Sequence, residues 1–252
     1  MLRRLVYRIH FLFGSVLGLL AFFLISVGCA LALLFSRVHG PTISYVWARC
    51  FGHSMATLLG WKLVIEGTEH FAAAPCIILA NHQSNLDIAT NGLVFPRNTL
   101  AVGKQELRKI PVFGWFFYKT KNVLLDRANP TVSRQSIAEA ARRINTERVS
   151  VFMFPEGHRN QKDERLPFKK GAFHLAIEAQ VPIILAVCEP IWTLLDARRG
   201  MVRPGRLLIR VLPPIPTKGL TADDLDKLVN DTHLRMQAEC DALRLQARAR
   251  IG

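Results

Sequence analysis

The feature that most constrains this chain is a run of 28 positions, Ile9 to Ser36, without Lys, Arg, Asp or Glu. As an α-helix the run would be roughly 42 Å long, which exceeds the ~30 Å hydrocarbon core of a bilayer. A secretory signal peptide is the alternative, because the preceding MLRRLVYR resembles a basic n-region. The apolar stretch is too long for a signal peptide and no small-residue cleavage site follows it cleanly. We therefore interpret it as a retained membrane anchor.

The flanking charges leave the orientation of this anchor open. Arg8 and Arg37 stand at its two ends, so the positive-inside rule assigns no direction. A second, moderately apolar segment, Thr42 to Leu59, predicts another helix, and two helices dipping into one leaflet would keep both ends on the same side. We expect helical membrane anchoring over residues 1–60 and one α/β domain over residues 61–252.

The distribution of charge favours a lipid surface over nucleic acid as the anionic partner. The net charge is +14 and the pI is about 10.2, which implies attraction to anions. The first acidic residue is Glu66, and the six basic residues before it accompany the apolar run. Nucleic-acid binding does not explain that combination. The five cysteines form no C-x-x-C pair and are odd in number, which indicates reduced thiols in a cytosol-facing protein.

Beyond Trp61, short apolar runs alternate with helical stretches. This pattern predicts an α/β domain with a mixed, mostly parallel sheet flanked by helices. The expected strands are Leu63–Glu66, Cys76–Ala80, Thr99–Val102, Val123–Leu125, Val149–Phe154, Ile183–Val187 and Leu207–Leu212. The expected helices are Leu86–Phe95, Val132–Asn145, Ala172–Ala179 and Ala222–Ala249, the last preceded by a capping signal at Thr221.

The strand Cys76–Ala80 ends in the polar sequence NHQSNLD, residues 81–87, which has two interpretations. Structurally, Ser84 and Asp87 fit the S-x-x-[DE] capping box of a helix. Chemically, five helical residues turn about 500°, so His82 and Asp87 meet only if His82 precedes the helix and Asp87 lies in its first turn. Asp87 would then hold one imidazole nitrogen and leave the other to accept a proton. A substrate hydroxyl would be activated directly, without a protein nucleophile.

Lys104, Arg127 and Arg159 each follow a predicted strand. Ligands of open α/β sheets gather at the carboxyl ends of the strands, so these cations are expected to converge on one anion. Each of them alone would be an ordinary solvated charge. Their combination with His82 and Asp87 favours a functional site.

Four ordered blocks resemble the glycerolipid acyltransferase family: residues 81–87 (NHQSNLD), 103–114, 154–159 (FPEGHR) and 181–184 (VPII). The similarity runs from about Leu63 to Pro214. It implies transfer of a fatty acyl group from a thioester, acyl-CoA or acyl carrier protein, to the sn-2 hydroxyl of 1-acylglycerol-3-phosphate, giving phosphatidic acid. It implies no metal, no cofactor and no covalent acyl-enzyme.

The resemblance also implies roles for single residues. His82 is the general base on the glycerol hydroxyl, and Asp87 is its orienting partner. Substrate binding falls on Asn81, Lys104, Arg127, Glu156, Gly157 and Arg159. Among these, the three cations hold the phosphate, and Glu156 and Gly157 shape its pocket.

The chain departs from the family pattern at three positions. His158 and Asn160 stand where threonine and serine are usual, and Leu185 stands where proline is usual. Because His158 and Asn160 flank Arg159, the acceptor headgroup stays open. The alternative acceptor is another lyso-lipid, such as a lyso-ornithine lipid or a different lysophospholipid.

Three rival functions fit parts of the sequence. GHSMA, residues 52–56, resembles the nucleophile elbow of a serine hydrolase around Ser54, but its last glycine is replaced and it lies in an expected helix. A non-enzymatic basic membrane module explains the anchor and the charge, but not the ordered blocks. His158 and His174 stand at no recognised metal-ligand spacing.

The donor chemistry bears on localisation. Thioester donors are made in the cytosol, so we expect a bacterial inner-membrane protein whose catalytic domain faces the cytoplasm. A single span with a cytosolic N-terminus would place His82 on the wrong side. The re-entrant helical pair, or a span with an external N-terminus, is therefore favoured.

Overall fold

The computed structural model describes residues 2–36, 39–126, 128–159 and 166–250. Its centre is a seven-stranded sheet in the order β1-β9-β6-β2-β5-β3-β4. Neighbouring strands are parallel except for β6 and β9. The strands are β1 (Trp61–Glu66), β2 (Ile77–Ala80), β3 (Thr99–Lys104), β4 (Val123–Leu125), β5 (Ser150–Met153), β6 (Ile183–Cys188) and β9 (Gly205–Val211). The predicted mixed, mostly parallel α/β fold is confirmed, and all seven expected strands are present.

The central strands are uniformly apolar because both faces of the sheet are covered, as is usual for parallel sheets. The four residues of β2 are fully buried and alternate between two separate cores. Ile77 and Leu79 belong to the core on one face of the sheet, whereas Ile78 and Ala80 belong to the core on the other face.

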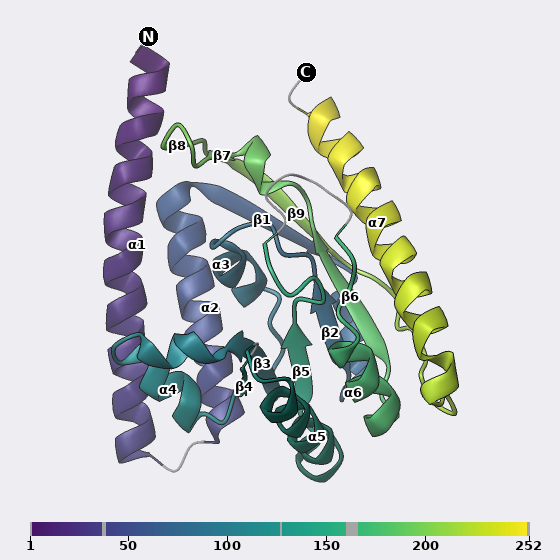
Figure 1. Ribbon diagram of the computed structural model, residues 1–252. Helices are drawn as coiled ribbons and strands as arrows, with labels where there is room; N and C mark the ends of the chain where they lie inside the picture. The colour runs from purple at the N-terminus through teal and green to yellow at the C-terminus, as the bar shows by residue number, and fades with distance from the viewer. Residues whose placement is uncertain (1, 37–38, 127, 160–165, 251–252) are drawn as a thin grey trace.

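Helices cover the two faces of the sheet unequally (Figure 1). On one face lie α5 (Pro130–Glu147), α6 (Gly171–Ala179) and α7 (Leu225–Ala249). On the other lie α2 (Gly40–Leu59), α3 (Asp87–Gly92) and α4 (Phe113–Lys119), with α1 (Leu2–Phe35) outside them. The α2 and α3 backbones approach closely, since a Cβ on Gly92 would lie 2.4 Å from the Ala48 carbonyl oxygen.

The N-terminal helices form an antiparallel pair, α1 beside α2 (Figure 1). By length and composition α1 is able to cross a membrane, with a mean hydropathy of 2.6 over its most apolar 18-residue window. Its outer surface exposes a row of large apolar side chains: Leu2, Leu5, Val6, Ile9, Leu12, Phe13, Val16, Leu19, Leu20, Phe23, Leu24, Leu31, Leu34 and Phe35. The second predicted helix, Thr42 to Leu59, lies within α2.

The expected boundary at residue 60 lies between α2, which ends at Leu59, and β1, which begins at Trp61. This helix nevertheless packs as part of the sheet domain, because Trp47 and Phe51 of α2 belong to the core that covers one face of the sheet. The first helix also contacts the domain, since α1 packs on α4 and on the short strand β8 (Met201–Val202).

Several short elements were not predicted. They are α4, the hairpin of β7 (Leu195–Asp196) with β8, and short 3-10 helices such as η2 (Gln105–Lys109). The predicted helix Leu86–Phe95 is shorter, with only α3 in regular geometry. The last predicted helix begins as a 3-10 turn, and Thr221 does form the expected capping box with Asp224.

Candidate active site

The carboxyl ends of four adjacent parallel strands, β2, β5, β3 and β4, meet at one edge of the sheet. His82 lies two residues beyond β2, and Glu156 lies three residues beyond β5. Lys104 is the last residue of β3. The strand order therefore brings residues from distant parts of the sequence to one edge, as expected for a ligand site of an open α/β sheet.

A single carboxylate oxygen organises the loop after β2. Oδ2 of Asp87 accepts hydrogen bonds from the backbone N–H groups of Gln83 (2.6 Å) and Ser84 (2.9 Å), and it lies 2.7 Å from Nδ1 of His82. Asp87 is the first residue of α3 and is 1% exposed. Because two amide donors already point at this oxygen, it acts as an acceptor and the imidazole donates through Nδ1. The Nε2 atom is thereby left as a proton acceptor.

The imidazole is held on a second side as well. Its ring stacks on Phe154 with centroids 4.1 Å apart and an angle of 14° between the ring planes. The His82 side chain is 20% exposed, so it is buried on most sides but still reachable. From the sequence we expected no role for Phe154, although this residue opens one of the four blocks.

Glu156, which follows β5 in the chain, contacts the loop after β2. Its Oε1 accepts a hydrogen bond from the backbone N–H of His82 at 3.0 Å, while its Oε2 is buried without a hydrogen-bond partner among the described residues. The pKa of Glu156 is raised to about 7, mainly because the carboxyl group is buried. The negative charge of Asp87 also raises this pKa, whereas the hydrogen bond from the His82 N–H lowers it. The side chain is 4% exposed.

Asn81 was expected to bind substrate, but both polar atoms of its side chain are hydrogen-bonded to the protein backbone. Asn81 is buried, its Nδ2 donates to the carbonyl of Cys188, and its Oδ1 accepts from the N–H of Cys188, both at 2.9 Å. Gln83, which we did not single out, makes similar bonds to the carbonyls of Cys188 and Glu189 and from the N–H of Ile191. These amides fasten the loop after β2 to the end of β6.

The structure describes some, but not all, of the residues predicted to bind the anion. Arg159 donates from Nη1 to Oδ1 of Asn85 at 2.7 Å, which brings an exposed guanidinium to the loop of His82. Lys104 is exposed at the same edge, two strands from β2 and so about 10 Å across the sheet. Gly157 has φ +75°, a left-handed conformation that favours glycine in the turn before Arg159. Arg127 lies outside the described residues, as does Asn160.

An apolar cavity of about 110 Å³ opens beside the His82–Asp87 pair. Asp87 and Phe154 line the end of this cavity next to His82. The remaining lining residues come mainly from α2, α3, β3 and α4: Ser44, Trp47, Ala48, Ile88, Asn91, Gly92, Phe95, Ala101, Val102, Gly103, Leu107, Phe113, Phe116, Phe117, Asn122 and Phe152. The aromatic residues of the sequence FGWFF thus mostly face this cavity, whereas Trp115 is partly exposed.

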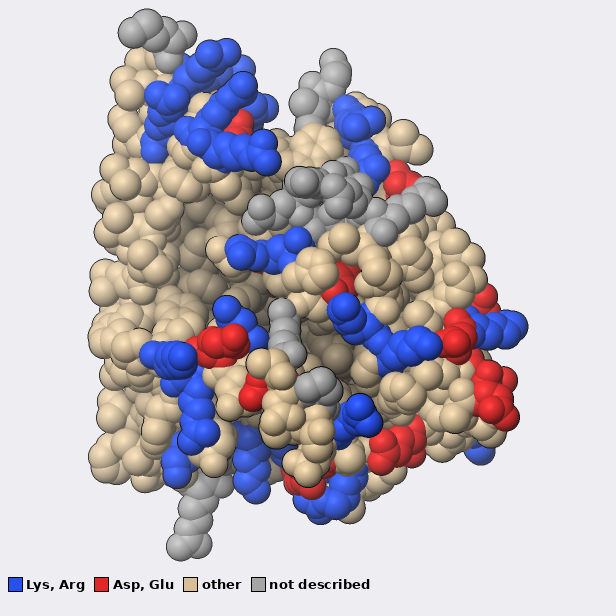
Figure 2. All heavy atoms as spheres, viewed as in Figure 1, with Lys and Arg blue, Asp and Glu red and all other residues tan. Residues whose placement is uncertain are grey.

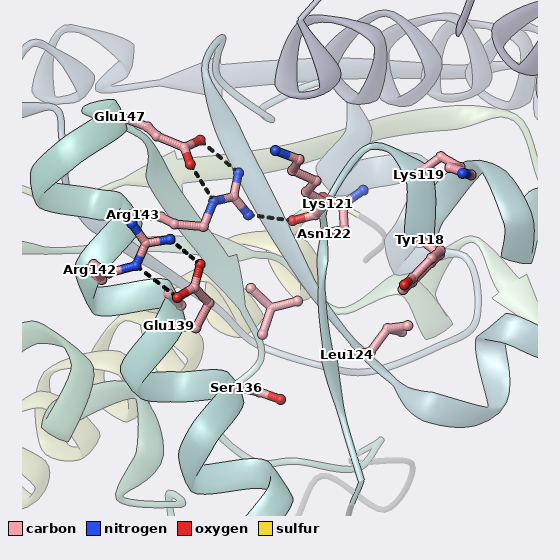
Figure 3. A pocket seen from close by; sticks show the side chains of 12 residues that line it. Tyr118, Lys119, Lys121, Asn122, Leu124, Ser136, Glu139, Arg142, Arg143 and Glu147 are labelled. Atoms are coloured by element: carbon pink, nitrogen blue, oxygen red, sulfur yellow. Dashed lines mark hydrogen bonds and ion pairs between the residues drawn. The ribbon is translucent and has the colours of Figure 1, made fainter. Parts of the chain in front are cut away.

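A larger hollow of about 530 Å³ lies between α4, β4 and α5 (Figure 3). Its arginines are already neutralised, because Arg142 pairs with Glu139 and Arg143 makes a two-point contact with Glu147. Arg143 also donates to the carbonyl of Lys121. This hollow therefore offers an anion much less free positive charge than its composition suggests.

The serine hydrolase interpretation is excluded by the fold. Ser54 lies in the interior of α2, so no strand runs into a sharp turn before it. His158 and His174 are both exposed, and among the described residues no three His, Cys, Asp or Glu side chains are grouped as metal ligands.

Comparisons with known proteins show which family the chain resembles. A family model described as acyltransferase matches residues 62–189, from β1 to just beyond β6. The chain is 32% identical over 237 residues to the 1-acyl-sn-glycerol-3-phosphate acyltransferase of Saccharomyces cerevisiae, covering 88% of this chain and 78% of that protein. It is 35% identical over 230 residues to the protein of the same name from Haemophilus influenzae, covering 88% and 94%.

The fold also has a solved counterpart. The crystal structure of the 1-acyl-sn-glycerophosphate (LPA) acyltransferase from Thermotoga maritima matches with a TM-score of 0.69 and 24% identity. The match covers 94% of this chain and 97% of that chain, so the likeness in fold includes the N-terminal helices.

The raised pKa of Glu156 predicts a specific pH dependence of stability. Because the folded protein holds this proton more tightly than the unfolded chain, the stabilisation is present below pH 4.5 and lost as the pH rises through 7. Relative to Glu156→Gln, the wild type should lose about 2 to 3 kcal/mol of unfolding free energy between pH 5 and pH 8. Urea unfolding in detergent micelles at both pH values measures this difference.

A matched control is the exposed carboxylate Glu106, since Glu106→Gln should leave the pH dependence of the wild type unchanged. A Glu156→Gln protein whose stability follows the wild type at both pH values would contradict the buried, protonated state of Glu156.

Proposed function

The chain belongs to the acyltransferase family, and on that premise we propose that it acylates the sn-2 hydroxyl of 1-acylglycerol-3-phosphate from a fatty acyl thioester, giving phosphatidic acid. The proposal is supported by relatives of that name that align over 88% of the chain. The observation that carries it is the contact between His82 Nδ1 and Asp87 Oδ2, which supplies an oriented base at the edge of a cationic site.

In this mechanism Nε2 of His82 takes the proton of the acceptor hydroxyl as the oxygen attacks the thioester carbonyl. Asp87 stabilises the imidazolium that forms and keeps the ring in the required tautomer. Collapse of the tetrahedral intermediate breaks the C–S bond, and the departing thiolate recovers the proton from His82. An ester and a free thiol result, with no acyl-enzyme intermediate.

Arg159, Lys104 and Arg127 would hold the phosphate of the acceptor. The support is strongest for Arg159, whose guanidinium already contacts the loop that carries His82. Planar guanidinium groups bind phosphate through paired, charge-assisted hydrogen bonds. Glu156 and Gly157 would shape the turn that presents Arg159, and the thioester would be that of coenzyme A or of acyl carrier protein.

The apolar cavity would take an acyl chain. Its lining is dominated by aromatic and aliphatic side chains, and it ends at Asp87 and Phe154, next to the reacting imidazole. An alkyl chain gains free energy there by leaving water, as does any apolar surface that becomes buried.

We further propose that α1 and α2 form a hairpin in one leaflet, on the cytoplasmic side. The first turns of α1 contact the sheet domain, with the rings of Tyr7 and Phe11 near Arg203 and Gly200 respectively. A helix crossing the bilayer would draw these β7–β8 residues into the lipid with it. Basic side chains gather at that end of the molecule (Figure 2), which suits an anionic membrane surface.

Replacing the base should nearly abolish turnover. His82→Ala is expected to lower kcat by about 10²–10⁴-fold, the usual contribution of a positioned general base. The measurement is release of free thiol from acyl-CoA and acyl carrier protein donors with 1-acylglycerol-3-phosphate. His174→Ala, an exposed histidine on α6, is the control and should keep wild-type kcat. A folded His82→Ala enzyme with most of its activity would refute the mechanism.

Arg159→Ala should act on acceptor binding rather than on the chemical step. Loss of a charge-assisted phosphate contact is expected to raise the KM for the acceptor by about tenfold or more, with a much smaller change in kcat. Arg142→Ala removes an exposed arginine on α5 and serves as the control. An unchanged acceptor KM would show that the phosphate lies elsewhere.

The hairpin predicts that both ends of the chain lie on the cytoplasmic side. Protease treatment of sealed inside-out vesicles should remove tags from the N-terminus and the C-terminus, and right-side-out vesicles should protect both. Protection of one tag and loss of the other in the same vesicles would instead establish a spanning α1.

A further inference from the structure

Two asparagines line the apolar cavity, and their hydrogen bonding differs completely. Asn122 is fully engaged: its Oδ1 accepts from the N–H of Ala101 at 2.8 Å, and its Nδ2 donates to the hydroxyls of Ser44 (3.0 Å) and Thr120 (2.8 Å). Asn91 is 3% exposed, yet neither its Nδ2 nor its Oδ1 has a partner among the described residues. A buried amide without partners is unfavourable, and such groups in a native structure call for a functional explanation.

Asn91 is an exception within its own surroundings. Trp47 Nε1 donates to the hydroxyl of Ser26 at 3.0 Å, Ser44 accepts from Asn122, and Oδ2 of Asp87 accepts three hydrogen bonds. The cavity is therefore not generally short of hydrogen bonds. Among the residues that line this cavity, Asn91 is the side chain whose buried polar atoms have no hydrogen-bond partner among the described residues.

The position of Asn91 indicates which part of a ligand would meet it. Asn91 follows Asp87 by one turn of α3, about 6 Å along the helix axis. Asp87 in turn contacts the imidazole of His82, which under the proposed function faces the reacting carbonyl. A chain that enters the cavity from the reaction centre therefore brings its carboxyl-proximal carbons, rather than its methyl end, to the amide of Asn91.

The chemistry of the amide indicates the matching group. An asparagine side chain offers both N–H donors and a carbonyl acceptor, and a hydroxyl is likewise donor and acceptor at one atom. An unsubstituted alkyl chain would fill the space but leave both amide atoms unpaired. A hydroxyl on the chain would satisfy them inside an apolar enclosure, where hydrogen bonds discriminate strongly.

We propose that the cavity selects an acyl chain carrying a hydroxyl group on its carboxyl-proximal part, and that Asn91 is the residue that selects it. This inference rests on the proposed acyl transfer and narrows its substrate class. The hydroxylated chain would belong either to the thioester donor or to the chain already esterified in the lysolipid, since both offer the same group.

The test compares matched substrates with the purified full-length protein in detergent micelles. One arm uses acyl-CoA with and without a 3-hydroxyl group at equal chain length, with an unsubstituted acceptor. The other arm uses the unsubstituted donor with 1-acylglycerol-3-phosphate whose chain does or does not carry the hydroxyl. The readout is the ratio of kcat/KM for the hydroxylated and the plain substrate.

The wild type is expected to favour the hydroxylated chain by about tenfold or more in one arm. Asn91→Leu, similar in size and apolar, should bring that ratio to about one or below and raise activity on the plain chain. It should also unfold at an equal or higher temperature, because an unpaired amide is removed. Asn91→Ala, measured in the same way, keeps the test decisive if the leucine variant does not fold.

The matched control is Phe95→Leu, which alters the shape of the same cavity without changing its polarity. It should change the rates for both chains alike and leave the ratio as in the wild type. A wild-type ratio near one in both arms, or a preference that survives in both Asn91 variants, would overturn the inference. The amide would then bind buried water or a part common to all donors. Absence of any transfer to 1-acylglycerol-3-phosphate would overturn the proposed function itself.

Discussion

The three hydrogen bonds accepted by one oxygen of Asp87 hold the site together. Two come from backbone N–H groups in the loop between β2 and α3, and the third comes from the imidazole of His82. The two backbone hydrogen bonds fix the conformation of the loop, and this conformation positions the imidazole ring of His82. One carboxylate therefore both shapes the turn before α3 and orients the histidine, whereas Leu86, the N-cap of α3, has no side-chain capping bond.

The two faces of the sheet have different properties. The face under α5, α6 and α7 is a continuous apolar core, whereas the face under α2, α3 and α4 encloses the cavity that reaches Asp87. The exposed apolar row of α1 lies on this second face. Under the proposed function, anchoring and chain binding share one side of the molecule, which keeps a lipid substrate near the reacting edge while its chain stays out of water.

Two of the buried side chains that have unpaired polar atoms lie near the same pair. Oε2 of Glu156 and the amide of Asn91 both lack partners among the described residues, and both residues neighbour the His82–Asp87 pair through direct contact or one helical turn. Most buried polar groups in proteins are satisfied, so unsatisfied ones at a cavity indicate places where a ligand completes the bonding.

The sequence by itself determined the apolar N-terminal helix, the seven strands and the spacing that allows His82 and Asp87 to meet, because these features depend on local patterns of apolar residues and turns. The order of the strands, and with it the approach of Glu156 and Arg159 to His82, was decided only by the tertiary structure. The tertiary structure also decided the hydrogen bonding of Asn81, whose partner Cys188 lies 107 residues away. Local spacing carries no information about such a contact. The same holds for α4 and the β7–β8 hairpin, which are too short to be stable alone and form because α1 and the sheet pack against them.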